Sequence, residues 1–130
     1  MANPEPLWAI LPKLDVFMCN LVEANRLTGQ SDPQTAADFL LSKGTKHVII
    51  KLGSQGCLLK TSQDSRIIPG MSCIVVDTTG AGDAFAAGLI AGLVQQQEVA
   101  TACVTAHQAA SRVVSSLGAV EAWFSPNYHP

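Results

Sequence analysis

Residues 75–92, "VVDTTGAGDAFAAGLIAG", pass from an apolar run through a glycine-containing turn into a second apolar run. We predict a buried strand, a turn and a helix in that order. The helix begins near Gly82, and residues 82–94 are apolar almost all round, which is typical of a helix buried in a larger protein. Two carboxylates, Asp77 and Asp83, flank the turn.

A strand that ends in a glycine turn and opens a helix presents unbonded backbone N–H groups at the positive end of the helix dipole. Gly80 and Gly82 would let a ligand approach the backbone closely there. The dinucleotide fingerprint G-x-G-x-x-G needs a third small residue, but Phe85 stands at that place, and the pattern G-x-x-x-x-G-K-[ST] is absent from the chain. We therefore expect a phosphate site of another kind.

The position of Asp83 favours phosphoryl transfer. A carboxylate beside a phosphate is repelled by it, but it is useful where it accepts the proton of an attacking hydroxyl. The structural alternatives are that the helix dipole stabilises Asp83, by about 0.3–1 kcal/mol, and that Asp77 caps the turn. Each alternative explains one aspartate well. Neither explains the whole segment 77–83 as well as it explains the single aspartate.

Segment 77–93, "DTTGAGDAFAAGLIAGL", resembles the C-terminal signature of the ribokinase/PfkB-like family of carbohydrate and nucleoside kinases. The resemblance implies Asp83 as the catalytic base that takes the substrate's hydroxyl proton. It implies that the backbone of Gly80, Ala81 and Gly82 forms the anion hole for the transferred phosphoryl group. Two further positions match those that bind a monovalent cation, often K⁺, namely Asp77 and Thr79.

Alternating strands and helices along the chain predict an α/β fold with a layered sheet. We expect strands at 15–20, 46–52, 57–61 and 72–77, a short extended segment at 66–70, and helices at 20–29, 32–44, 82–94 and 98–117. Residues 1–13 contain several prolines and are expected to be irregular. The resemblance implies a ribokinase-like arrangement, Rossmann-like with flanking helices, in which residues 1–130 form the C-terminal nucleotide-binding and catalytic part.

"NLVEANRLTG" at 20–29 resembles the N-x-x-E motif of the same family. The resemblance implies that Asn20 contacts the nucleotide phosphates and that Glu23 helps to hold Mg²⁺ through water. Asparagine followed three residues later by glutamate is also a capping box, which needs no ligand. The pattern by itself favours the capping box, and its place ahead of the signature favours the ligand.

"KLGSQG" at 51–56 resembles the strand and turn that hold ATP phosphates in the family. The resemblance implies that Lys51, Gly53, Ser54 and Gly56 line the nucleotide. A hairpin loop with glycines at tight positions explains the local sequence equally well.

The last helix carries further candidates. His107 lies near its apolar stripe, where a lone histidine is usually a core residue, but the resemblance implies a place beside the adenine. "VVSSLGAVEA" resembles the segment that completes the monovalent-cation site through backbone carbonyls, at Val113, Ser116 and Gly118. A side-chain oxygen often follows four residues later in the family, and Ala122 stands there.

Composition excludes several classes of function. The chain has 130 residues, 48% hydrophobic and 14% charged, with a net charge of −2 and no basic run. We therefore expect neither a nucleic-acid nor a membrane partner. The four cysteines are dispersed, which predicts reduced thiols in a cytoplasmic protein without zinc.

The resemblance covers residues 14–122 and implies that family members are more than twice this length. We expect the function to be ATP- and Mg²⁺-dependent phosphorylation of a sugar or nucleoside hydroxyl, with little or no turnover by the isolated chain. The alternative is a non-catalytic nucleotide-binding or oligomerisation remnant, while a dinucleotide-dependent oxidoreductase is disfavoured by Phe85. A sheet cut through its middle exposes an edge, so we expect homo-oligomers that pair through it.

Overall fold

The computed structural model of the chain describes residues 3–71 and 80–115. The chain divides into two compact units, Met1–Pro69 and Gly70–Pro130. The predicted strand at 72–77 lies outside the described residues. Within the described ranges, none of the helices is long and apolar enough to span a bilayer.

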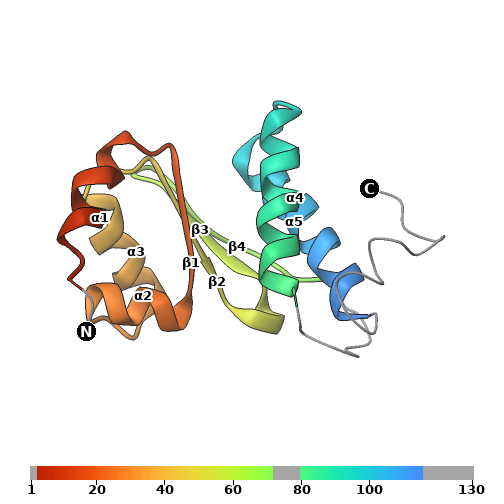
Figure 1. Cartoon of the computed structure of the whole chain (residues 1–130), viewed down its shortest axis with the longest axis horizontal. Coiled ribbons are helices and arrows are strands. Elements are labelled where there is room, and N and C mark those ends of the chain that lie inside the picture. The colour runs from red at the N-terminus through yellow and green to blue at the C-terminus, as the bar shows by residue number, and fades with distance from the viewer. Residues whose placement is uncertain (1–2, 72–79, 116–130) are drawn as a thin grey trace. The chain divides into compact units, whose positions relative to one another are not determined.

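The first unit is a four-stranded sheet with helices on one face (Figure 1). Strand β1 pairs in parallel with β2, and β2, β3 and β4 follow one another as antiparallel neighbours. The elements in order are α1 (Glu5–Ile10), the 3-10 turn η1 (Leu11–Lys13), β1 (Val16–Asn20), α2 (Leu21–Thr28), α3 (Pro33–Ser42), β2 (His47–Lys51), the 3-10 turn η2 (Gly53–Gln55), β3 (Cys57–Lys60) and β4 (Ser65–Ile68).

Local signals predicted most of these elements. The strands expected at 15–20, 46–52 and 57–61 and the helices at 20–29 and 32–44 are confirmed, and the segment at 66–70 contributes to β4. Helix α2 ends at Gly29, whose φ of +72° is the left-handed conformation that glycine adopts at low cost. Helix α3 begins with Pro33 after Asp32, whose side chain accepts a hydrogen bond from the Thr35 amide.

The expectation that residues 1–13 are irregular is wrong. Pro4 precedes α1 and a second proline lies in its first turn, where a missing N–H costs nothing. The apolar residues between the prolines then hold the segment on α3. The Trp8 ring lies edge-on to Phe39 at 5.8 Å between centroids, the Lys43 ammonium lies 5.2 Å from the Trp8 centroid, and Leu11 is fully buried.

One apolar core joins the helices of this unit to the sheet. Alternate residues of a strand point to one face, so β2 supplies two of them, Val48 and Ile50. The buried members are Leu11, Cys19, Ala24, Ala36, Ala37, Leu40, Val48, Ile50 and Leu58. This core fixes α2 and α3 on the sheet and thereby fixes where α2 begins.

The second unit contains α4 (Ala81–Val94) and α5 (Val99–Val114), which confirms the helices predicted at 82–94 and 98–117 as far as the described residues extend. Two glycines of α4 permit the close approach of α5. A Cβ on Gly88 would lie 2.9 Å from the Ala106 Cα, and one on Gly92 would lie 2.9 Å from the Ala102 Cβ. The opposite side of α4 carries exposed Ile90 and Val94, in keeping with its nearly continuous apolar sequence.

Candidate functional site

In the first unit, the predicted nucleotide residues gather at the carboxyl ends of the parallel strands. The register places Asn20, the last residue of β1, opposite Lys51, the last residue of β2. Helix α2, which carries Glu23, begins directly after β1, and the 53–56 turn follows β2 by one residue. Ligands of open α/β sheets bind beyond the carboxyl ends of such strands, so the topology groups these residues where a ligand is expected.

Asn20 and Glu23 form the capping box that their spacing predicts. The Asn20 Oδ1 accepts a hydrogen bond from the Glu23 amide at 2.8 Å, and the Asn20 amide donates to the Glu23 Oε1 at 3.0 Å. Both residues are thus held in place by each other. The cap uses one oxygen of each side chain, which leaves the Asn20 Nδ2 group and the second Glu23 oxygen for other contacts.

The 53–56 turn has the backbone geometry that its glycines suggest. Gly53 has a φ of +64° and Gly56 a φ of +98°, both in the region that favours glycine. The Leu52 amide donates to the Gly56 carbonyl at 2.8 Å, which closes the turn between β2 and β3. The hairpin interpretation is therefore confirmed, and it leaves the proposed phosphate contact untested.

A buried thiol lies beneath this end of the sheet. Burial, together with the negative charge of Glu23, raises the pKa of Cys19 to about 12, although the Lys51 ammonium acts in the opposite direction. Because the thiolate is the reactive form, Cys19 stays a neutral core residue at physiological pH. Its role is to pack in the core of the first unit.

In the second unit, α4 begins at Gly80 with a left-handed backbone, φ +79° and ψ 1°, and without a side-chain cap. The first three helical residues, Ala81, Gly82 and Asp83, have amides that no residue of their own helix can bond. The Asp83 side chain is exposed in that first turn. The arrangement therefore combines donors that α4 itself leaves unbonded, a positive dipole end and a carboxylate, as phosphoryl transfer requires.

Helix α5 packs behind this turn. Ala84 and Val113 are both 2% exposed and pack together with Ala109. Phe85 is 3% exposed, and its ring meets the His107 ring edge to face at 5.0 Å and 73°. From the sequence, Phe85 only excludes a dinucleotide motif, because no local pattern predicts a contact between residues so far apart in the chain.

His107 is buried at 8% exposure, and its Nε2 has no hydrogen-bond partner in the part of the chain that the structure describes. Its burial agrees with the core interpretation and leaves the expected place beside adenine untested. Val113 lies in the last turn of α5. The resemblance implies that its carbonyl binds the monovalent cation. The remaining cation candidates, Asp77, Thr79, Ser116 and Gly118, lie outside the described residues.

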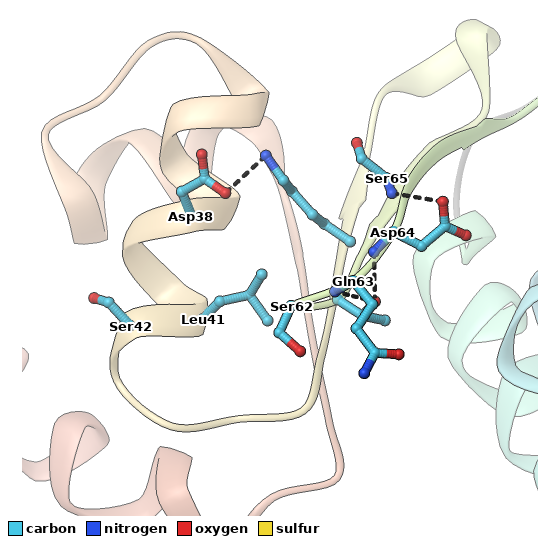
Figure 2. A pocket seen from close by; sticks show the side chains of 9 residues that line it. Asp38, Leu41, Ser42, Ser62, Gln63, Asp64 and Ser65 are labelled. Atoms are coloured by element: carbon cyan, nitrogen blue, oxygen red, sulfur yellow. Dashed lines mark hydrogen bonds and ion pairs between the residues drawn. The ribbon is translucent and has the colours of Figure 1, made fainter.

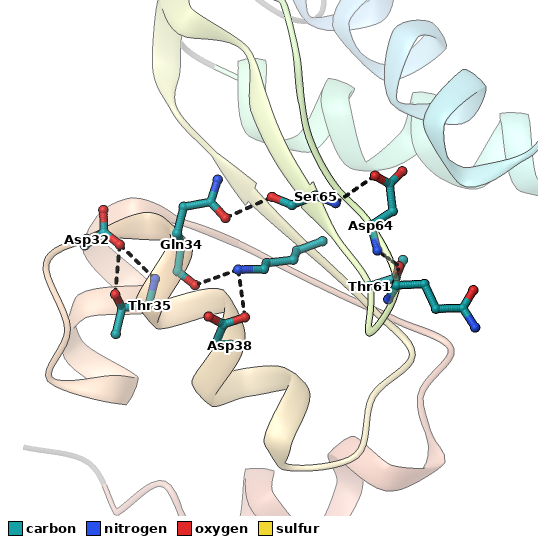
Figure 3. Close-up of polar contacts among 9 residues, drawn as sticks. Asp32, Gln34, Thr35, Asp38, Thr61, Asp64 and Ser65 are labelled. Atoms are coloured by element: carbon teal, nitrogen blue, oxygen red, sulfur yellow. Dashed lines mark hydrogen bonds and ion pairs between the residues drawn. The ribbon is translucent and has the colours of Figure 1, made fainter.

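A separate pocket of about 520 Å³ lies at the opposite end of β3, between α3 and the β3–β4 turn (Figure 2). The Lys60 ammonium crosses to Asp38 at 2.7 Å, and Ser65 Oγ donates to the side-chain oxygen of Gln34 at 2.9 Å (Figure 3). These bonds link α3 to the β3–β4 hairpin. The pocket is lined by Asp38, Leu41, Ser42, Lys60, Thr61, Ser62, Gln63, Asp64 and Ser65, none of which is a predicted site residue.

The family resemblance assigns Glu23 to Mg²⁺, and its geometry can be compared with that role. Mg²⁺ keeps several waters and takes one or two carboxylates together with substrate phosphates. Glu23 offers one oxygen beyond the capping box, which suits binding through water. Among residues 3–71 and 80–115 no three histidine, cysteine or carboxylate side chains cluster to enclose a metal.

Comparison with known proteins finds relatives that are named as kinases. A 2-dehydro-3-deoxygluconokinase of Bacillus subtilis is 42% identical over 80 residues, 61% of this chain and 25% of that protein. A ribokinase of Haemophilus influenzae is 33% identical over 126 residues, 90% of this chain and 41% of that protein. The crystal structure of aminoimidazole riboside kinase from Salmonella enterica with aminoimidazole riboside and an ATP analog matches with a TM-score of 0.80 at 30% identity, covering 93% of this chain and 44% of that one.

The chain spans less than half the length of the curated relatives it matches. A model of the pfkB family of carbohydrate kinases matches residues 3–125, which is nearly the whole chain. The match includes the uncapped start of α4, the capping box of α2 and the glycine turn after β2. The chain therefore belongs to the pfkB carbohydrate kinase family.

Proposed function

We propose that the chain is the nucleotide-binding and catalytic part of an ATP-dependent kinase that phosphorylates a hydroxyl group of a sugar or nucleoside. The observation that carries this proposal is the start of α4, where uncapped amides and the exposed Asp83 occur together. The relatives support the substrate class, because those named above are a sugar-acid kinase, a ribokinase and a riboside kinase.

In the proposed reaction, Asp83 accepts the hydroxyl proton as the substrate oxygen attacks the γ-phosphorus of ATP. The bond between that phosphorus and the β–γ bridging oxygen breaks, and ADP leaves with the electron pair. The amides of Gly80, Ala81 and Gly82 donate hydrogen bonds to the transferred group, where negative charge is greatest in the transition state. Donors fixed beforehand lower the barrier because they need no reorganisation during transfer.

The proposal assigns the remaining phosphate contacts to the first unit. The Asn20 Nδ2 group is a neutral donor and the Lys51 ammonium is a cationic one, and both residues lie at the carboxyl end of the parallel strands. Gly53, Ser54 and Gly56 offer a turn whose backbone a phosphate can approach closely. His107 is assigned to the adenine side on the family resemblance.

Two cations complete the proposal. Mg²⁺ bound to the phosphates neutralises charge during transfer, and Glu23 would hold it through water. K⁺ would be bound by Asp77 and Thr79 and by the backbone carbonyls at Val113, Ser116 and Gly118. Omission of K⁺ from the assay should then weaken ATP binding, while Na⁺ of equal concentration serves as the control.

The test is calorimetric titration of the whole chain with ATP, Mg²⁺ and K⁺, followed by an assay of phosphoryl transfer to a panel of sugars and nucleosides. Binding near one ATP per chain is expected for the wild type and for Asp83→Asn, which keeps the side-chain shape. Transfer, where the wild type shows any, should be lost in Asp83→Asn. Transfer that survives this change would contradict the assignment of the base.

The second candidate function is a non-catalytic nucleotide-binding or oligomerisation module. It shares the nucleotide contacts proposed above and differs from the first candidate in lacking the transfer step. ATP binding without transfer to any acceptor would support it. Self-association through the outer edge of β1, the first strand of the described sheet, would do so as well, and a monodisperse monomer in a sizing experiment would contradict that part.

A cytoplasmic location is also part of the proposal. Cys19, Cys57 and Cys103 are buried thiols, and thiols of this kind persist in a reducing compartment. Fractionation of the producing cells would test it, and recovery in a secreted fraction would contradict it.

A further inference from the structure

The first turn of α4 lacks the local support that most helix starts have. Gly80 offers no side chain to bond the amides that follow, and its own φ is +79°. The hydrogen bond that closes the turn runs from the Ala84 amide to the Gly80 carbonyl at 2.9 Å. A turn that keeps its donors for a ligand must be held by tertiary packing, because its own side chains do not cap it.

That packing comes from α5 at the two residues after Asp83. Ala84 packs against Val113 and Ala109. Phe85 packs edge to face on His107, with centroids 5.0 Å apart and planes at 73°. This geometry is one that the ring quadrupoles favour beyond the burial of area. Both contacts lie on the side of the turn away from the exposed Asp83 side chain.

The identity of residue 107 is unusual for a packing position. His107 is 8% exposed as a residue, and within the described residues its Nε2 has no hydrogen-bond partner. Burial of an unbonded polar nitrogen is unfavourable, so leucine or phenylalanine would pack there at lower cost. The feature that the position keeps is a flat ring lying edge-on to Phe85, which is an aromatic pair.

We propose that His107 is a positioning residue for the phosphoryl-transfer turn. By packing on Phe85 it fixes the first turn of α4, and thereby the direction of the Asp83 carboxylate and of the Ala81 and Gly82 amides. The role rests on the proposed function, because those groups matter as a site only if the turn binds phosphate. It needs no contact between His107 and the nucleotide.

The experiment compares His107→Ala with His107→Phe, which restores an aromatic ring, and with Leu89→Ala. Leu89 is 5% exposed in the middle of α4, so its truncation opens a comparable cavity away from the first turn. Two quantities are measured on the whole chain. One is hydrogen exchange at the Ala84 and Phe85 amides, and the other is the affinity for ATP and for inorganic tripolyphosphate, which has no adenine.

His107→Ala is expected to speed exchange at the first turn by up to about tenfold, which corresponds to the loss of one aromatic pair. It should weaken the binding of tripolyphosphate as well as that of ATP, and His107→Phe should restore first-turn exchange and tripolyphosphate binding. Leu89→Ala should lower the melting temperature and leave first-turn exchange and ligand affinity unchanged. If His107→Ala does not fold, His107→Leu, which keeps the volume without a ring, takes its place.

Unchanged first-turn exchange in His107→Ala would overturn the proposal. Weaker binding of ATP with unchanged tripolyphosphate binding would also overturn it, because it would assign His107 to the adenine alone. A wild-type chain that binds neither ligand would refute the proposed function instead. The exchange measurement would then still decide whether His107 holds the turn.

Discussion

Helices α2 and α4 both begin where the family resemblance predicts phosphate contacts, but their first turns are built differently. Helix α2 has a capping box in which Asn20 and Glu23 satisfy each other's amides. Helix α4 follows a left-handed glycine and has no side-chain cap. One start uses its polar groups to hold itself, and the other keeps its amides for another partner.

The difference shows how a helix start can be both stable and open. A capped turn is stable by itself and offers a ligand only the atoms that the cap leaves over, such as the Asn20 Nδ2. An uncapped turn offers a ligand backbone amides that no side-chain cap uses. Its stability then depends on packing against a neighbouring element. For α4 that element is α5, which packs against Ala84 and Phe85.

The largest effect is expected where α4 and α5 touch. Gly88→Ala should reduce the free energy of unfolding by about 1–3 kcal/mol, because the new Cβ would lie 2.9 Å from the Ala106 Cα. Alanine has the higher helix propensity, so propensity alone predicts the opposite sign. Chemical denaturation measures the change, and the exposed Ala87→Gly serves as a control for propensity. A more stable Gly88→Ala would show that α5 does not constrain α4 there.

The next effect concerns the backbone at Gly80. Gly80→Ala should cost about 1–2 kcal/mol, because an L-residue is strained at φ +79°. Gly29→Ala is the matched control, since Gly29 has φ +72° and nothing within 4 Å of a new Cβ. Both variants should lose similar stability by denaturation, but calorimetry should show weaker ATP binding only for Gly80→Ala. Equal ATP affinity in the two variants would remove the α4 start from the site.

Local signals predicted the α2 start better than the α4 start. Asn20 and Glu23 are three residues apart, so their hydrogen bonds follow from spacing alone. The support of α4 depends on His107 and Phe85, which come from different helices, and periodicity placed His107 only near an apolar stripe. The prolines led to a wrong prediction at residues 1–13, because the packing of Trp8 on Phe39 and the burial of Leu11 are tertiary effects.

A smaller effect is expected at the α2 cap. Asn20→Ala should cost about 1 kcal/mol by denaturation, the usual value for a lost N-cap. Asn20→Asp keeps a capping oxygen, so its stability should equal that of the wild type. It should still bind ATP more weakly, because a carboxylate replaces the amide donor beside the phosphates. Unchanged ATP affinity in Asn20→Asp would mean that Asn20 serves the cap alone.

At Glu23 the stability change should be smaller again. Glu23→Gln keeps an oxygen for the Asn20 amide, which completes the capping box, so the change should stay within about 0.5 kcal/mol. The expected effect is on Mg²⁺, whose apparent affinity in the presence of ATP should fall. Titration of Mg²⁺ at fixed ATP measures it, with Glu5→Gln, on α1, as a control for loss of one negative charge. Identical Mg²⁺ curves for both variants would contradict the assigned role of Glu23.

The smallest effect separates a charged cap from a neutral one. Hydrogen bonds from the Thr35 amide and hydroxyl hold the pKa of Asp32, the α3 cap, below its usual value of 3.8. A lowered pKa adds stability above the unfolded-state value, and that contribution is lost as the pH falls through the folded-state value. Asp32→Asn keeps a capping oxygen that does not titrate. The two chains should therefore be equally stable at pH 7, and the wild type should become the less stable one below pH 3.8 in thermal unfolding. Parallel curves down to pH 2 would show that this cap does not depend on its charge.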